Sequence, residues 1–245
     1  MVALEIFKSQ FIHLIQNFKE FFKILFPLAL FAVLLTSDFL VNILMHSDRF
    51  VILVILRIVY ILFIIRVIIN IHRLVILNEA FDYYALNKRL KETLLYICYG
   101  ILGFVVTFLV FLPFGAVILA SYGKAYTFSY PIQFKILFGI FITLSYIFFI
   151  LNFPMISTGK KIKFFKMIKL SKGFRLTLLL QVIVFSIITL VMNFISGFVF
   201  GFTLVLSMHF VTIILNLILA FLNLLIMAWS VSCISKTYML WKKAR

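Results

Sequence analysis

Hydroxyl, amide and imidazole side chains recur at regular spacing in two long apolar segments of the C-terminal half. The last segment repeats a polar residue every seven positions, at His209, Asn216, Asn223, Ser230 and Thr237. The segment before it has polar residues three or four positions apart, at Ser186, Thr189, Asn193 and Ser196. Both spacings keep the polar groups on one face of an α-helix. These groups can exchange hydrogen bonds with another helix or with a solute.

Polar groups that face lipid are unfavourable, so both stripes are expected to face protein. Interhelical hydrogen bonding that holds a bundle together is the interpretation we favour, because amides and hydroxyls commonly do this in membranes. The alternative is a polar path for a solute along the two helices. A water-accessible cavity between them would distinguish the second interpretation from the first.

Charged residues inside apolar segments are a second candidate for chemistry, since such charges are costly in a membrane. Asp38 and Arg57 lie at similar distances from the turn that joins the first two apolar segments. In an antiparallel hairpin they could form a buried ion pair. A structural pair is favoured over contact with a substrate or an ion. Arg66 lies nine residues after Arg57, on the opposite helix face, so the two do not form one site.

Recognisable catalytic and metal-binding patterns are missing from the sequence. The four histidines lack metal-ligand spacing, and no phosphate-binding glycine loop or nucleophile elbow occurs. His72, Arg73 and Glu79 are predicted to form a structural polar cluster at the membrane interface. Cys98 and Cys233 are expected to be unpaired, small apolar side chains. The sequence thus predicts no enzymatic activity, no cofactor and no metal.

The composition requires lipid as the solvent for most of the chain. Of the 245 residues 65% are hydrophobic and only 12% are charged, and the mean hydropathy is +1.24. Soluble domains are about half apolar and one quarter charged. Too few polar residues exist to cover a water-exposed surface. The predicted fold is therefore an all-α, polytopic membrane helix bundle that forms a single domain over 1–245.

A membrane-spanning helix needs about 20 mostly apolar residues. Six segments meet or nearly meet this length, at about 22–43, 50–71, 93–120, 136–153, 176–200 and 203–238. The last is longer than a bilayer requires, so its first turns are expected to tilt, bend or lie along the surface. The first apolar run is too long for a signal-peptide core and is expected to remain attached.

Basic residues mark one side of the predicted bundle. Most of the 23 Lys and Arg lie near the N-terminus, in the loops after the second and fourth segments, and at the C-terminus. The opposite loops contain only Arg49, Lys124 and Lys135. Because cytoplasmic loops carry the excess of Lys and Arg, both termini are expected in the cytoplasm.

The net charge of +16 is expected to serve topology and anionic phospholipids rather than nucleic acid. Residues 1–21 and the basic segment 159–175 have apolar residues at helical spacing among lysines, which is typical of amphipathic interfacial helices on the cytoplasmic side. The predicted lipid contacts are Lys160, Lys161, Lys163, Lys166, Lys169, Lys172 and Arg175.

Three stretches carry a family resemblance: IHRLVILNE from Ile71, FPMISTGKKIKFFKMIKLSKGFRLTLL after the fourth segment, and VSCISKTYMLW near the C-terminus. They resemble poorly characterised bacterial multi-pass membrane proteins related to the membrane domain of glycerophosphodiester phosphodiesterases. The resemblance implies a helical bundle of the bacterial inner membrane with no assigned reaction. The phosphodiesterase chemistry belongs to a separate soluble domain of that family, which this sequence lacks.

Two functions are compatible with these observations. The first is a non-enzymatic inner-membrane protein that organises the membrane or binds lipid or an unidentified protein partner through its basic cytoplasmic face. The alternative is a transporter or channel for a small solute or ion, which would use the polar seam of the fifth and sixth segments.

Overall fold

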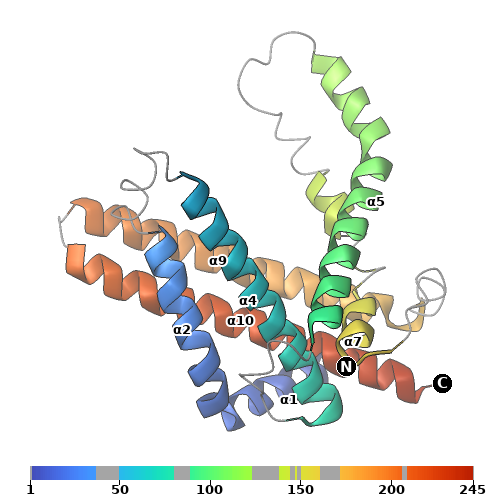
Figure 1. The fold of residues 1–245 in the computed structure, drawn as a ribbon. Helices are drawn as coiled ribbons and strands as arrows, with labels where there is room; N and C mark the ends of the chain where they lie inside the picture. Colours follow the sequence, from blue (N-terminus) through green and yellow to red (C-terminus); the bar gives the residue numbers. More distant parts are fainter. Residues whose placement is uncertain are drawn as a thin grey trace.

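The computed structural model describes residues 2–36, 50–79, 89–122, 138–143, 147, 150–160, 172–205 and 209–244. The elements in these ranges are all helices (Figure 1). They are α1 (Val2–Gln16), α2 (Phe18–Thr36), α4 (Phe50–Leu77), α5 (Leu90–Tyr122), α7 (Asn152–Ser157), the short 3₁₀ helix η2 (Lys172–Phe174), α9 (Arg175–Val205) and α10 (His209–Lys243).

Four of these helices are long and apolar enough to cross a membrane, judged by their length and composition. The candidate spans are Val51–Leu77, Leu90–Val117, Arg175–Val199 and Val211–Lys243. Large apolar side chains point outward from them, and Phe194 on α9 is 75% exposed. Such a surface suits lipid, where a helix also satisfies its own backbone hydrogen bonds. These findings confirm the prediction of an all-helical chain and indicate a membrane protein.

The first, fourth and sixth predicted spans fall partly on residues outside the described ranges, which for the sixth are 206–208. The structure describes the first, predicted at 22–43, as far as Thr36, and only parts of the fourth, at 136–153. The number of six spans therefore stays a prediction.

Helix α10 is the central element of the bundle, since it packs against α1, α2, α4, α7 and α9. The main apolar core lies where α2 and α4 meet α10 and includes Phe21, Leu25, Ile71 and Ala228. Ala228 is completely buried. A small side chain at this contact allows close approach of the helices, which is a common form of packing in membranes.

Helix α1 is held on the bundle by an aromatic cluster. The ring of Phe7 lies 5.5 Å from that of Phe185 on α9 and 6.0 Å from that of Trp229 on α10. The indole Nε1–H of Trp229 also donates a hydrogen bond of 3.2 Å to the Phe7 carbonyl. In Figure 1 the N-terminus and the C-terminus lie at the same end of the bundle. The N-terminal helix is thus packed against α9 and α10.

Candidate functional site

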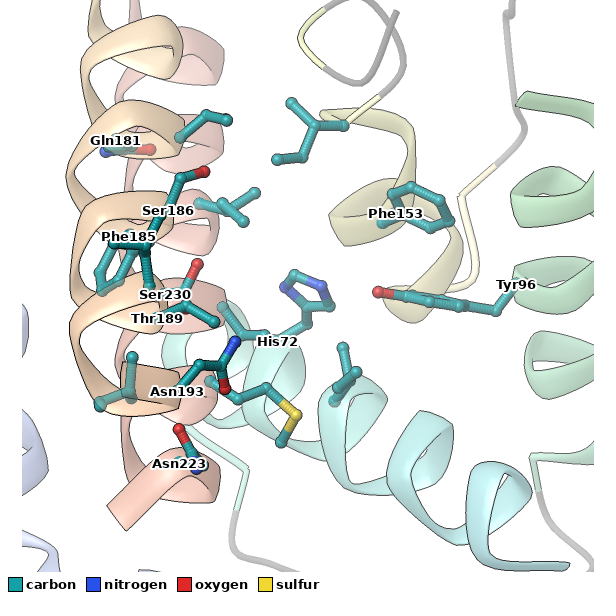
Figure 2. Close-up of a pocket in the computed structure, with 18 residues that line it drawn as sticks. His72, Tyr96, Phe153, Gln181, Phe185, Ser186, Thr189, Asn193, Asn223 and Ser230 are labelled. Atoms are coloured by element: carbon teal, nitrogen blue, oxygen red, sulfur yellow. The ribbon is translucent and has the colours of Figure 1, made fainter. Parts of the chain in front are cut away.

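A cleft of about 770 Å³ lies among the C-terminal half of α4, the start of α5, α7, α9 and α10 (Figure 2). Its volume falls within the ~300–1,000 Å³ that is usual for small-molecule sites. The lining residues are Ile68, His72, Tyr96, Ile150, Phe153, Gln181, Val182, Phe185, Ser186, Thr189, Leu190, Asn193, Asn223, Ile226, Met227, Ser230, Val231 and Ile234.

The two polar stripes of the sequence meet in this cleft. Helix α9 contributes Ser186, Thr189 and Asn193, and α10 contributes Asn223 and Ser230. Figure 2 shows these five side chains on neighbouring turns of the two helices, along one side of the cleft. The regular spacing places them together because each interval of three or four residues is close to one helical turn.

One other described member of the predicted seam lies outside this group. Asn216 on α10 is partly buried but is not among the lining residues. The side chain of His209 lies outside what the structure describes. The part of the two polar stripes that lines the cleft therefore lies around Asn193 on α9 and Asn223 on α10.

The described walls of the cleft carry no formal charge. None of the described residues that line it is Asp, Glu, Lys or Arg. Amides, hydroxyls and one imidazole alternate with apolar and aromatic side chains such as Phe153 and Phe185. An ion inside would lose hydration without gaining an opposite charge, which is strongly unfavourable. The walls suit an uncharged molecule that has both apolar and hydrogen-bonding parts.

His72 belongs to the cleft, although the sequence suggested an interfacial cluster with Arg73 and Glu79. The His72 side chain is 1% exposed, and its Nδ1 lies 2.7 Å from the Oγ of the fully buried Ser235 on α10. Figure 2 shows the imidazole between α10 and the ring of Tyr96, whose hydroxyl points toward it. Because consecutive helix residues are rotated by about 100°, Arg73 projects from a different face.

Gln181 forms the matching contact on the other side of α10. Its Nε2 donates a 2.8 Å hydrogen bond to Oγ1 of the fully buried Thr237. The sequence analysis did not select Gln181. Helical spacing could have identified it, since Gln181 precedes Phe185 and Thr189 by four and eight residues and all three line the cleft.

A separate ionic cluster is formed by Arg73, Arg89 and Glu79. Arg73 Nε and Nη2 each lie 2.7 Å from a carboxylate oxygen of Glu79, and Arg73 Nη1 donates a 2.8 Å hydrogen bond to the Ser157 carbonyl at the end of α7. Arg89 bonds to Glu79 at 3.3 Å and also to Asn70. The cluster thus joins α4 to α7 and to the residue just before α5. The hydrogen bonds from Arg73, with further attraction from both arginines, lower the pKa of the Glu79 carboxyl.

The basic residues predicted to contact lipid are described only in part. Lys161, Lys163, Lys166 and Lys169 lie outside the described residues, as does the side chain of Lys172. The side chain of Arg175 is partly buried at the start of α9.

Lys160 is described in more detail than its basic neighbours. Its Nζ lies 5.9 Å from the centre of the Tyr238 ring. A hydrogen bond and repulsion from Lys242, together with burial, lower the pKa of Lys160. Two basic side chains therefore approach each other where α7 ends beside α10.

The remaining predictions concern ion pairing and metal binding. Arg57 is exposed on α4, and its predicted partner Asp38 lies outside the described residues, so this pair stays a prediction. Cys98 is exposed, Cys233 is buried, and both are free thiols. Within the described residues no group of three His, Cys, Asp or Glu could hold a metal ion.

Comparison with known proteins gives no match to a family model, to a curated protein or to a solved structure. The resemblance to membrane domains of glycerophosphodiester phosphodiesterases therefore stays a prediction.

The ionic cluster predicts a pH-dependent stability. Because the pKa of Glu79 is lowered in the folded protein, its contribution is complete above the ordinary carboxyl pKa of about 4.3 and is lost as the pH falls through the lowered value. Glu79→Gln should therefore lower the melting temperature of the detergent-solubilised protein at pH 7, by an amount equivalent to about 1 kcal/mol or less for this partly exposed pair. The difference from the parent should disappear at low pH.

Glu20→Gln is the matched control, since the pair that Glu20 forms with Lys23 at 3.0 Å is about half exposed on both sides. This variant should change the melting temperature little. Equal losses for the two variants at pH 7, or a loss for Glu79→Gln that persists at low pH, would contradict the role assigned to the cluster.

Proposed function

We propose that this chain is a multi-pass protein of the bacterial inner membrane that binds an uncharged polar solute in the cleft and allows it to pass. The observation that carries the proposal is a cleft lined by both polar stripes without a charged residue among its described walls. A hydrogen-bonded seam filled with side chains would have favoured a purely structural role. The open volume beside Asn193 and Asn223 instead favours a solute.

The extent of the polar lining along α9 supports passage as well as binding. Gln181 and Asn193 are both lining residues and lie twelve positions apart. At 1.5 Å per residue they are separated by about 18 Å along the helix. The apolar core of a bilayer is about 30 Å thick. Polar groups therefore follow more than half of the depth that a solute would have to cross.

The arrangement in the membrane is part of the same proposal. We place six spans in the bilayer, with both termini and the basic segment 159–175 in the cytoplasm. The asymmetric distribution of Lys and Arg supports this orientation. We also propose that the protein is not an enzyme, because the sequence has no catalytic motif and the described lining residues of the cleft include no titratable group besides His72 and Tyr96.

A second candidate function, binding of anionic phospholipid, is favoured by the approach of Lys160 to Lys242. The two lysines repel each other. A lipid phosphate between them would offset that repulsion. Lipid binding at this end is compatible with solute binding in the cleft.

Thiol labelling tests whether water reaches the cleft. Asn193→Cys and Ser230→Cys, made in a Cys98→Ser background and reconstituted in liposomes, should react with a membrane-impermeant methanethiosulfonate. Phe194→Cys is the matched control, because Phe194 is the next residue of α9 and is 75% exposed but does not line the cleft. A thiol in lipid stays protonated and reacts slowly, so the cleft positions should react at least about tenfold faster. Equally slow reaction at all three positions would refute the solute-binding proposal.

Lipid retention tests the second candidate. The double variant Lys160→Gln/Lys242→Gln should retain less phosphatidylglycerol than the parent after purification in mixed phosphatidylglycerol and phosphatidylcholine micelles, as measured by native mass spectrometry. Each surface lysine contributes about 1 kcal/mol to attraction of anionic lipid. Lys19→Gln/Lys23→Gln removes the same charge elsewhere and should have a smaller effect. An equal loss in both double variants would indicate nonspecific attraction and contradict a site at Lys160 and Lys242.

A further inference from the structure

The hydroxyl groups of α10 determine which atoms the cleft presents to a ligand. Ser235 Oγ donates to the Val231 carbonyl at 2.8 Å, and Thr237 Oγ1 donates to the Cys233 carbonyl at 2.9 Å. A hydroxyl has one hydrogen to donate and two lone pairs that accept. Because both hydrogens are used within α10, each hydroxyl can only accept from a partner on another helix.

The partners on α4 and α9 must therefore be the donors. We therefore assign the proton of the imidazole to His72 Nδ1, which lies 2.7 Å from Ser235 Oγ. A neutral imidazole with a proton on Nδ1 has an acceptor lone pair on Nε2. The neutral form fits a side chain that is 1% exposed in a cleft without a carboxylate among its described lining residues. Nε2 has no hydrogen-bond partner among the described residues.

The same reasoning applies to Gln181. Its Nε2 donates to Thr237, which leaves the amide oxygen Oε1 as the free acceptor. This oxygen is buried and has no hydrogen-bond partner, in a side chain that is 2% exposed and lines the cleft. A buried acceptor without a partner costs free energy, which a bound donor would recover.

The two acceptors are placed on opposite sides of α10. Ser235 and Thr237 are two residues apart, which corresponds to a rotation of about 200° around the helix. His72 therefore approaches α10 from the α4 side, and Gln181 approaches it from the α9 side. Figure 2 shows the two side chains on separate walls of the same cleft. Both residues line the cleft, so its α4 wall and its α9 wall each present one hydrogen-bond acceptor.

We infer that the cleft selects uncharged molecules that carry hydroxyl or amide N–H donors, which bind to His72 Nε2 and Gln181 Oε1. This inference rests on the proposed function and specifies its solute. An anion would be repelled by the two acceptors, and a cation would find no carboxylate among the described lining residues. The walls formed by Phe153 and Phe185 suit an apolar framework between the donor groups. Alcohols and polyols with a short carbon skeleton belong to this class.

Protection of a cleft thiol against labelling tests the inference. Ser230→Cys in the Cys98→Ser background is labelled in the presence of 1,6-hexanediol or of 1,6-dimethoxyhexane, which has the same six-carbon chain but no hydrogen-bond donors. The diol should slow labelling by about threefold to tenfold more than the ether, as expected for one or two hydrogen bonds. Equal protection by the two compounds would overturn the inference.

Gln181→Met removes the acceptor and should reduce protection by the diol toward that of the ether. Gln10→Met is the matched control, since Gln10 on α1 is 5% exposed and also has an unpartnered Oε1 but does not line the cleft. It should leave the difference between the compounds unchanged. Full protection by the diol in Gln181→Met would count against the assigned acceptor. If that variant does not fold, the comparison of diol and ether in the protein that retains Gln181 decides whether the cleft selects hydrogen-bond donors.

The outcomes separate this inference from the proposed function. A Ser230→Cys thiol that is not labelled in the absence of any probe would show a dry cleft, and both proposals would fail. Labelling without discrimination between diol and ether would leave a hydrated cleft and refute only the selection of donors.

Discussion

The arrangement of this bundle depends on the hydrogen bonds that the buried hydroxyls of α10 make. Ser232, Ser235 and Thr237 are completely buried, and each donates to the carbonyl four residues before it. In the interior of a membrane protein a polar group has little water to bond with, so an unpaired group is costly. His72 and Gln181 each bond to one of these hydroxyls. These two contacts join α4 and α9 to the central helix through polar groups.

The same geometry explains why a cleft exists beside a well-packed core. Apolar side chains fill the contact of α2 and α4 with α10, where Phe21 and Ala228 are fully buried. On the other side, α4 and α9 are joined to α10 through polar contacts, and α7 is joined to α4 through Arg73 and the Ser157 carbonyl. The cleft between these helices is therefore lined in part by polar side chains. Its hydrogen-bonding groups are consequently available to a ligand.

The sequence predicted the elements of the site better than their assembly. Segment length and apolar composition predicted α4, α5, α9 and α10 as long apolar helices, because these properties are local. The periodic spacing of Ser186, Thr189 and Asn193 on α9, and of Asn223 and Ser230 on α10, also identified residues that share the cleft. Periodicity gives the face of a helix, and the structure shows that these two faces line a common space.

Contacts between distant segments could not be predicted in this way. His72 was grouped with Arg73 and Glu79 because they are close in sequence, yet the bond from His72 to Ser235 joins residues 163 positions apart. Whether two polar stripes close into a dry seam or line a cleft depends on the position of α7 and α5, and no local pattern encodes that position. Helical spacing could have placed Gln181 on the face of Thr189, but its bond to Thr237, 56 positions away, appears only when the helices are packed. The tautomer that we assign to His72 rests on the same contact and could not be inferred from the sequence.

The protonation of His72 is the most direct test of this account. Solid-state ¹⁵N NMR of histidine-labelled protein in lipid bilayers at pH 7, with the His72 signals assigned by their loss in His72→Gln, reports which ring nitrogen carries a proton. The account predicts a neutral ring with a proton on Nδ1 and an unprotonated Nε2. A proton on Nε2 alone, or an imidazolium with protons on both nitrogens, would contradict it.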